Sequence, residues 1–487
     1  MNYRRFALLT AFLVGIMGCS LTKATAEAHP LGELEDVAAS MQIDRRATKI
    51  AGNTGVTVIG YNSTTTSVKT GRAKMVFAHF MVGNAYDFNS TDQWVKEMEL
   101  AQSAGIDGFA LNIGLDEWVP DRVASAYEAA STLSDTFYLF FSFDMSIFTS
   151  SDVQTMIDYV TKYHGHTNQF VYHDGDFVST FSGETTFGSP PGTAWDTAFI
   201  QPLASSGITI HFVPSWSSLD PSTAYDTNTA VSGLFSWAAW PTSDNPNVTT
   251  EYDTYYSSAA SRLNKTYMAP VSPWFCTHFS YKNWIYASED LMHTRWQQVI
   301  DLDPELVEII TWNDWGESSY LAPYRGLGAP TGSEAWVEGF SHDAWLDLTA
   351  YYIAEYKTGR KTSVLQEKIW YWYRPHSKSA VATADPYGLP EWADVAKDVV
   401  TVVVALAAPA TLYVTSGSNT VAQECTESGM HAFQFGPFVE GEQRFLLVRD
   451  GQVVLNGTGT VDIEGLSVKE YNFNAATGII KYNDGSS

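Results

Sequence analysis

Apolar runs alternate with amphipathic stretches along the first two thirds of the chain. Met75 to Phe80 has the pattern of a buried strand, and the helical pattern after it opens with the capping box Ser90 to Gln93 and ends at Gly105. The unit then repeats, which predicts eight strands. They are Met75 to Phe80, Asp107 to Ile113, Phe137 to Phe143, Phe170 to Tyr172 or on to Thr180, Ile208 to Val213, Gly233 to Ala239, Thr266 to Val271 and Leu306 to Thr311.

Helical patterns fall between most of these strands, for example at Val119 to Leu133, Val153 to Tyr163 and Ser288 to Leu302. Eight such units predict an α/β fold of the (β/α)8 TIM barrel type over residues 72–380. A doubly wound open sheet shows the same alternation. Because no GxGxxG follows the first strand and the unit repeats eight times, the pattern favours the barrel.

The pattern changes after the aromatic run Ile369 to Tyr373 and the polar break Ser377 to Pro390. Short strands with a period of two follow, and Asp450-Gly451 is typical of a tight hairpin turn between two of them. Residues 381–487 are therefore predicted to form a C-terminal β-sandwich. Such a domain either packs against the barrel or acts as a carbohydrate-binding module, and its fold alone does not assign it a function.

The first residues predict export from the cell. Arg4 and Arg5 precede the apolar stretch Phe6 to Met17, and Ala24 to Ala26 is typical of a cleavage site. Residues 1–26 are interpreted as a signal peptide and the polar residues 27–71 as a leader or linker. No other apolar run is long enough to span a membrane. Five sequons agree with a secreted glycoprotein: Asn62, Asn89, Asn247, Asn264 and Asn456.

Composition limits the partners of the chain. The formal charge is −26, and removal of the three basic residues of the signal leaves −29, so nucleic acid and anionic membranes are unsuitable partners. A neutral substrate fits the 14% aromatic content. Cys276 and Cys425 are either one disulfide or two buried thiols. No spacing of metal ligands is present, so neither a metal nor a cofactor is expected, and the chain is expected to be a monomer.

The segment TWNDWGESSY, Thr311 to Tyr320, follows the last predicted barrel strand and carries two acids, Asp314 and Glu317. Side chains at the carboxyl ends of barrel strands share one mouth, and glycosidic bond cleavage needs two carboxylates, one to protonate the leaving oxygen and one to activate water or attack carbon. The flanking Trp312, Asn313 and Trp315 suit sugar binding. The simpler alternative is that both acids only cap the next helix.

Other residues at predicted strand ends are candidates for substrate contacts. Asp144 ends the third strand and either binds a sugar hydroxyl, tunes Glu317, acts as the base or caps a helix. His79 and Asn112 are also consistent with purely structural roles. Four tryptophans lie near strand ends, where a ring can stack on a sugar. Each alone is more typical of the core, but the four together beside an acid pair predict at least one sugar platform: Trp216, Trp237, Trp240 and Trp274.

Together these residues resemble glycoside hydrolase family 71, the fungal α-1,3-glucanases or mutanases. The resemblance rests on VFAHFMVGNAYDF, GIDGFALNIG, FYLFFSFDMS and TWNDWGES and spans about residues 72–375. It implies endo-hydrolysis of α-1,3-glucan with inversion, with Glu317 as general acid and Asp314 as general base. The alternatives are a related barrel hydrolase acting on another α-linked glycan, such as an endo-α-mannosidase-like enzyme, and a non-catalytic wall-glucan-binding protein.

Overall fold

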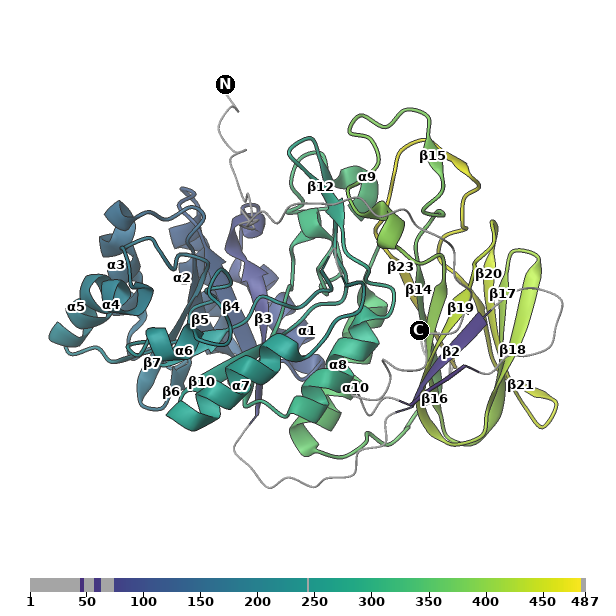
Figure 1. Ribbon diagram of the computed structural model, residues 1–487, viewed down its shortest axis with the longest axis horizontal. Helices are drawn as coiled ribbons and strands as arrows, with labels where there is room; N and C mark the ends of the chain where they lie inside the picture. Colours follow the sequence, from purple (N-terminus) through teal and green to yellow (C-terminus); the bar gives the residue numbers. More distant parts are fainter. Residues whose placement is uncertain (1–43, 48–56, 63–73, 243–244, 483–487) are drawn as a thin grey trace, which may run out of the picture.

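The computed structural model describes residues 44–47, 57–62, 74–242 and 245–482 (Figure 1). An α/β part, drawn in purple to green, adjoins a β-rich part, drawn mainly in yellow-green (Figure 1). Among the described residues, no helix has the length and apolar character of a membrane span. The predicted signal peptide and most of the predicted leader lie outside the described residues.

A curled parallel sheet organises the α/β part, with the strand order β8-β7-β5-β4-β3-β13-β10-β9. These strands are β3 (Met75–Met81), β4 (Gly108–Ile113), β5 (Tyr138–Asp144), β7 (Gly175–Phe181), β8 (Ile210–Phe212), β9 (Gly233–Phe235), β10 (Thr266–Val271) and β13 (Leu306–Ile309). All eight predicted strands are present. The α/β class and the alternation of strands and helices are therefore confirmed.

The fourth predicted strand differs in detail. Residues 170–180 form a hairpin, in which β6 (Val171–Tyr172) runs antiparallel to β7. His173 and Asp174 turn the chain with φ values of 48° and 64°. The parallel strand of this unit is thus β7, and the apolar run at Phe170 precedes it.

Two backbone hydrogen bonds connect the two ends of the strand order. The Ser232 amide donates to the Phe212 carbonyl over 2.9 Å, and the Phe235 amide donates to the Pro214 carbonyl over 3.0 Å. Within the described ranges, no strand ladder pairs β8 with β9. The sheet is therefore curled so far that its two outer strands come within hydrogen-bonding distance.

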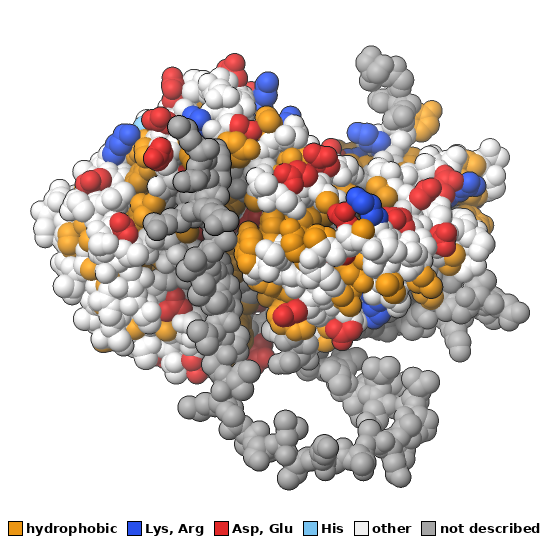
Figure 2. Space-filling model, turned by 90° about the horizontal axis from the view of Figure 1, so that it is seen from above, with side chains coloured by type: hydrophobic (Ala, Val, Ile, Leu, Met, Phe, Trp, Pro, Cys, Tyr) orange, Lys and Arg blue, Asp and Glu red, His pale blue; other side chains and the backbone are white. Residues whose placement is uncertain are grey.

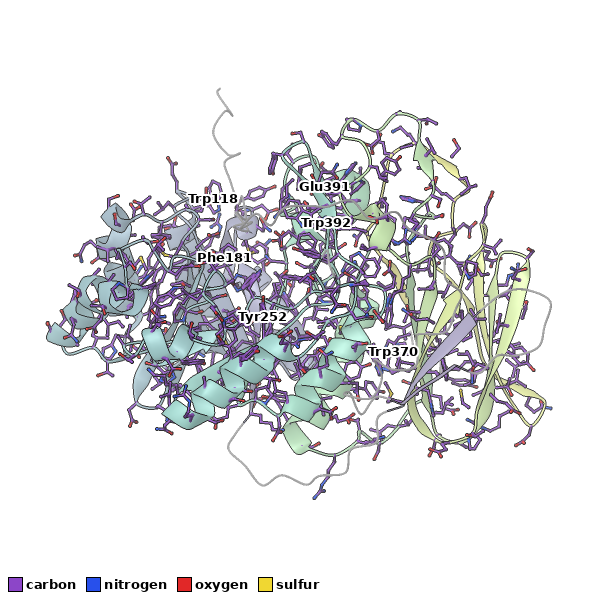
Figure 3. All side chains as sticks on the ribbon, in the orientation of Figure 1. Trp118, Phe181, Tyr252, Trp370, Glu391 and Trp392 are labelled. Carbon is purple, nitrogen blue, oxygen red and sulfur yellow. The ribbon has the colours of Figure 1, made fainter. Side chains whose placement is uncertain are left out.

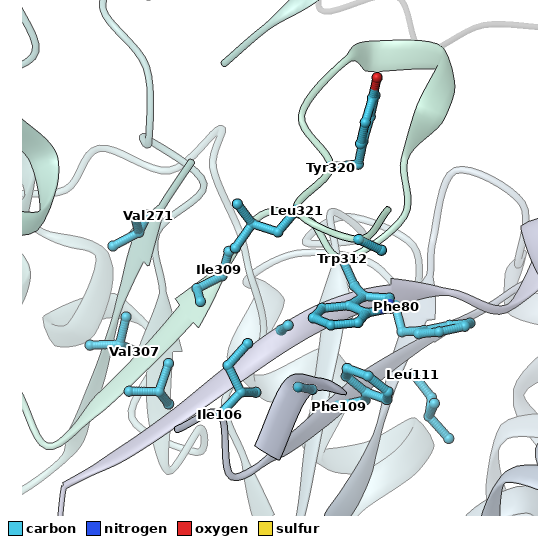
Figure 4. Close-up of a cluster of buried hydrophobic side chains, with 14 of the residues drawn as sticks. Phe80, Ile106, Phe109, Leu111, Val271, Val307, Ile309, Trp312, Tyr320 and Leu321 are labelled. Atoms are coloured by element: carbon cyan, nitrogen blue, oxygen red, sulfur yellow. The ribbon is translucent and has the colours of Figure 1, made fainter. Parts of the chain in front are cut away.

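Successive residues of the strands face opposite sides of the curled sheet. Phe77, Phe140, Phe177 and Phe235 belong to one cluster inside the curl. Their neighbours in sequence pack outward against the helices, and Figure 4 shows part of this outer cluster, with Trp312 beside Phe80 and Phe109. Because both faces are buried, the strands are almost continuously apolar, as parallel sheets require. A few polar residues interrupt the apolar inner face, among them His79 and Asp144, and they belong to the candidate active site described below.

Helices cover the outer face of the sheet (Figure 1). The long ones are α1 (Thr91–Ser103), α2 (Val119–Thr132), α3 (Val153–Tyr163), α7 (Glu251–Leu263), α8 (Leu291–Leu302) and α10 (Asp343–Thr358). Short helices are α4 (Pro191–Trp195), α5 (Gln201–Ser205), α6 (Ala224–Thr227) and α9 (Glu334–Val337). The predicted capping box of Ser90 and Gln93 is confirmed at the start of α1.

The β-rich part consists mainly of two sheets. One has the order β1-β2-β19-β16-β14-β23, and the other β18-β17-β20-β21. Their strands are β1 (Asp44–Ala47), β2 (Thr57–Asn62), β14 (Lys368–Tyr373), β16 (Val400–Leu406), β17 (Ala410–Ser416), β18 (Asn419–Cys425), β19 (Gly429–Gly436), β20 (Gln443–Arg449), β21 (Gln452–Thr458) and β23 (Ala476–Lys481). The turn Asp450-Gly451 joins β20 to β21 with positive φ at both residues, as predicted.

A second core lies between these sheets, where Tyr371 of β14 stacks on Phe445 of β20 at 4.3 Å between ring centres. The opposite face of β14 presents Trp370 and Trp372 to the core of the α/β part. The aromatic run Ile369 to Tyr373 thus belongs to a C-terminal sheet and joins the two parts. Cys276 and Cys425 are both buried free thiols and do not form the disulfide that was the other alternative.

Candidate active site

The segment Thr311 to Tyr320 forms a tight loop at the carboxyl end of β13. The Asp314 amide donates to Thr311 Oγ1 over 2.8 Å, and the Glu317 amide donates to Asp314 Oδ1 over 3.2 Å, at the start of a 3-10 turn, Trp315–Glu317. Asp314 therefore does cap a turn, as the simpler alternative held. The same hydrogen bond keeps the two acids together at the mouth of the curled sheet.

Lys282 approaches the two acids from a hairpin formed by β11 (Cys276–Phe279) and β12 (Lys282–Ile285). Its ammonium group forms an ion pair with the Glu317 carboxylate. Burial alone would lower the pKa of Lys282, but the charges of Glu317 and Asp314 outweigh burial and raise it. Lys282 is therefore a cation at this site.

Asp314 and Glu317 are both partly buried, and Lys282 pairs with Glu317. Burial and the neighbouring charge of Glu317 raise the pKa of Asp314 to about 7, although Lys282 and backbone amides oppose the rise. Below that pH the Asp314 carboxyl keeps its proton, whereas Glu317 is the acid that pairs with the Lys282 ammonium group. The two acids thus have different environments, which is the usual basis for separate acid and base roles.

His79 and Glu308 form a buried pair inside the curl, with 2.6 Å between His79 Nδ1 and Glu308 Oε1. Burial raises the pKa of Glu308, and the bond to His79 opposes this. Trp237 meets the His79 ring edge-on at 5.0 Å. Glu308 thereby fixes the orientation of the imidazole beneath the mouth.

Asp144 ends β5 and accepts hydrogen bonds from the amide and the hydroxyl of Ser146, at 3.0 and 2.6 Å. Burial raises the pKa of Asp144, and its nearby charges include His79 and Glu317. Asp144 therefore faces the same mouth as the acid pair. Asn112 of β4 is buried and lies opposite Met81 in the register with β3.

The predicted tryptophan contacts divide into two groups. Trp237 and Trp240 are partly exposed, and the Trp240 indole donates to the Trp274 carbonyl over 3.1 Å. Trp216 and Trp274 are only 1% and 2% exposed. For these two the prediction of sugar stacking is wrong, because Trp195 and Phe212 cover the first, and Trp345 covers the second.

Trp312, Asn313 and Trp315 lie on the other side of the loop from the acids. The Trp312 indole donates to the buried Glu97 carboxylate over 2.9 Å, and the Asn313 side chain bonds both backbone groups of Met81. These three residues line a pocket of about 230 Å³, which Asp314 and Glu317 do not line. Trp312 and Asn313 thus hold the loop onto α1 and β3, and contact of these three residues with sugar stays a prediction.

Lys282 and Glu308 are the site residues that the sequence did not indicate. Lys282 is a single cation in the aromatic stretch Phe279 to Tyr286, and Glu308 is a single acid inside an apolar strand. A charged residue at an inward position of a buried strand or hairpin was the available signal. Within the parts of the chain that the structure describes, no cluster of His, Cys, Asp and Glu has the make-up of a metal site.

Two adjacent carboxylates with unlike environments, at the carboxyl edge of a curled parallel sheet and beside exposed aromatic rings, define a glycoside hydrolase. The comparison with known families agrees with this class. The chain belongs to glycosyl hydrolase family 71, whose model matches residues 72–487.

Similar proteins are found in fungi. A glucan endo-1,3-alpha-glucosidase of Schizosaccharomyces pombe is 42% identical over 84% of this chain and 95% of its own. A mutanase of Penicillium rubens is 40% identical over 85% and 90%, and an ascus wall endo-1,3-alpha-glucanase of S. pombe is 33% identical over 83% and 96%. Among solved structures, an endo-alpha-mannosidase of Bacteroides thetaiotaomicron covers 59% of this chain and 98% of its own at 12% identity, with a TM-score of 0.44.

Proposed function

We propose that this glycoside hydrolase cleaves α-1,3-glucosidic bonds within α-glucan of fungal cell walls, by an endo-acting, inverting reaction at Asp314 and Glu317. The observation that carries the proposal is the acid pair with its cation Lys282 in the loop after β13. Three relatives named for endo-1,3-α-glucanase or mutanase activity support the substrate, because each matches more than four fifths of this chain.

The division of roles within the pair follows from the charges. The resemblance gives the proton-donor role to Glu317 and the base role to Asp314. The substrate-free site favours the opposite division, because Asp314 has a pKa raised to about 7 and Glu317 is paired with Lys282. We therefore propose that Asp314 protonates the departing glycosidic oxygen. Glu317 accepts a proton from the water that attacks the anomeric carbon, so that one water is consumed per bond broken.

The surrounding residues bind and orient the sugar in this proposal. Asp144 is placed for contacts to hydroxyl groups, whereas His79 is only 1% exposed and is held by Glu308, so it is proposed to support the mouth from beneath instead of contacting the sugar. Trp237 presents a partly exposed ring beside His79 and is proposed as a stacking surface. No cofactor or metal enters the reaction as proposed.

The rest of the chain is assigned in the same proposal. The two hydrogen bonds between the end strands β8 and β9 support a complete (β/α)8 barrel, followed by a β-sandwich that packs against it. The domain boundary is proposed before β14, because β14 pairs with β16 and β23.

Residues 1–26 are proposed as a signal peptide of a secreted monomer. The exposed sequons Asn89, Asn247, Asn264 and Asn456 are compatible with glycosylation.

The test is incubation of the purified protein with insoluble α-1,3-glucan, with reducing ends measured over time and fresh products followed by NMR. Release of oligosaccharides that first carry the β-anomer is the expected result. First appearance of the α-anomer would overturn inversion. Turnover of an α-mannan but not of α-1,3-glucan would replace the substrate, and binding of glucan without cleavage would leave a wall-binding protein.

A further inference from the structure

Exposed aromatic side chains gather beside the acid pair on hairpin β11–β12 and on residues 385–392. Tyr281 of the hairpin is 61% exposed and Trp392 is 36% exposed, and Tyr286 is partly buried. Hydrophobic side chains gather on the face seen from above in Figure 2, the side on which Figure 1 draws β12. Figure 3 shows Glu391 and Trp392 beside the hairpin.

Residues 385–392 come from the polar break that follows β14, yet they are firmly attached to the hairpin. The Glu391 amide donates to the Asn283 carbonyl over 3.0 Å, and the Ile285 amide donates to the Glu391 carbonyl over 3.2 Å. Asp385 accepts a hydrogen bond at 2.8 Å from the Tyr471 amide and is 2.8 Å from His278 Nε2. The segment therefore has a fixed position.

The rings form a stack that leads away from the acids. Trp392 is stacked on Tyr286, with 5.8 Å between ring centres and 18° between planes, and Tyr286 is stacked on Trp240 at 6.0 Å and 22°. Lys282 of the same hairpin pairs with Glu317, and burial together with the charge of Glu317 raises the pKa of Tyr286. The stack therefore belongs to the hairpin that contacts the acid pair.

The backbone conformation of Trp392 supports a binding role independently of the ring contacts. Trp392 has φ 61°, in the left-handed region that favours glycine and is costly for a bulky residue. The chain holds a large, partly exposed indole in this conformation, although a glycine would relieve the strain. Conformations of this kind cluster at ligand-binding positions, where a side chain is needed in one place.

We propose that Trp392 and Tyr286 form a subsite for the glucan chain beyond the acid pair, built jointly by the β11–β12 hairpin and residues 385–392. The occupant is a glucosyl unit several residues from the cleaved bond. A flat aromatic face suits the apolar face of a sugar ring, and the position beside Glu317 puts the unit on the same chain as the cleaved bond. The inference rests on the proposed function.

The test compares Trp392→Phe, which keeps a ring, with Trp392→Gly, which suits φ 61° and removes it. The substrates are α-1,3-gluco-oligosaccharides of two or three units and of eight or more. For the long substrate, we expect Trp392→Gly to raise KM about three- to tenfold with kcat little changed, and Trp392→Phe to stay near wild type. The shortest cleaved substrate should not distinguish the variants. Tyr482→Ala is the control, because Tyr482 is 69% exposed and lies after β23.

Binding separates the subsite from the reaction. Each change is repeated in the Glu317→Gln background, and oligosaccharide affinity is measured by calorimetry, with thermal unfolding as the check that each variant folds. Weaker binding of long but not short oligosaccharides on loss of the ring supports the subsite, even if wild type cleaves no α-1,3-glucan and the proposed function fails. Equal affinity of Trp392→Gly and its parent for the long oligosaccharide would overturn the subsite.

Discussion

The loop Thr311 to Tyr320 and the hairpin β11–β12 meet across the acid pair, but they are built differently. The loop is one continuous piece of chain, whose acids are three residues apart and are tied together by a local hydrogen bond. The hairpin side is assembled from residues 276–286 and 385–392, about a hundred positions apart, which only the fold brings together. The chemistry is thus local in sequence, whereas the control of charge and of substrate binding depends on tertiary structure.

The largest expected effect comes from replacing the two acids of the loop. Asp314→Asn and Glu317→Gln should each lower kcat on α-1,3-glucan by about a thousandfold or more, as loss of a general acid or base does. Glu442→Gln is a matched control, since Glu442 pairs only with the exposed Arg444 far from the site. Initial rates of reducing-end release measure the effect. Near wild-type turnover in either variant would remove that residue from the mechanism.

The proposed roles are separated by chemical rescue. Azide should restore turnover of Glu317→Ala and give a β-configured glycosyl azide, because the anion replaces the water that the base activates. Asp314→Ala should not respond to azide, but it should retain turnover of α-glucosyl fluoride, whose leaving group needs no proton. If azide instead rescues Asp314→Ala, the division of roles that the resemblance implies is the correct one.

The contribution of the hairpin β11–β12 is tested at Lys282. Lys282→Met removes the cation beside both acids, and we expect kcat to fall about ten- to a hundredfold. Lys282 lowers the pKa of Asp314, so its loss should raise that pKa above about 7. With Asp314 as the proton donor, the alkaline limb of the pH profile should move to higher pH. Lys282→Arg, which keeps the charge, should preserve the limb, and an unmoved limb in Lys282→Met would contradict the coupling.

The sequence predicted the features that are local in the chain and missed those that depend on tertiary structure. The eight strands could be predicted because each is a short apolar run buried on both faces, and the acid pair because it directly follows one of them. Trp216 and Trp274 could not be distinguished from exposed tryptophans, since the direction of a ring after a strand end depends on the path of the loop. The pairing of β14 with β16 and β23 was missed because aromatic alternation does not reveal a strand's partner.

Lys282 and Trp392 show the same limit at the site. Neither has a local pattern that indicates function, and each acquires its role from a neighbour far away in sequence. Trp312 and Asn313 are the opposite case, because their local pattern did indicate a function. Their position next to Asp314 suggested sugar contacts, but their hydrogen bonds to Glu97 and Met81 hold the loop in place. Proximity in sequence to a candidate catalytic acid thus predicts support of the loop as readily as contact with substrate.

The smallest expected effect is on stability, and it measures what the fold loses by burying an acid for chemistry. Burial and the charge of Glu317 raise the pKa of Asp314 to about 7 in the folded protein, compared with 3.8 for an exposed aspartate. Below pH 3.8 both states hold the proton and Asp314 costs nothing. As pH rises towards 7 the unfolded state releases its proton while the folded state keeps it, so stability falls, and above pH 7 the loss is complete. Asparagine resembles the protonated acid and does not titrate. Asp314→Asn should therefore be more stable than wild type at pH 8 and similar near pH 4. The full shift corresponds to about 4 kcal/mol, and solvent screening of this partly exposed carboxyl reduces the expected difference to about 2 kcal/mol. Denaturant unfolding of both proteins at the two pH values measures it. A gain of equal size at both pH values would mean that the pKa of Asp314 is the same in the folded and unfolded states, and would remove the electrostatic support for its role as the donor.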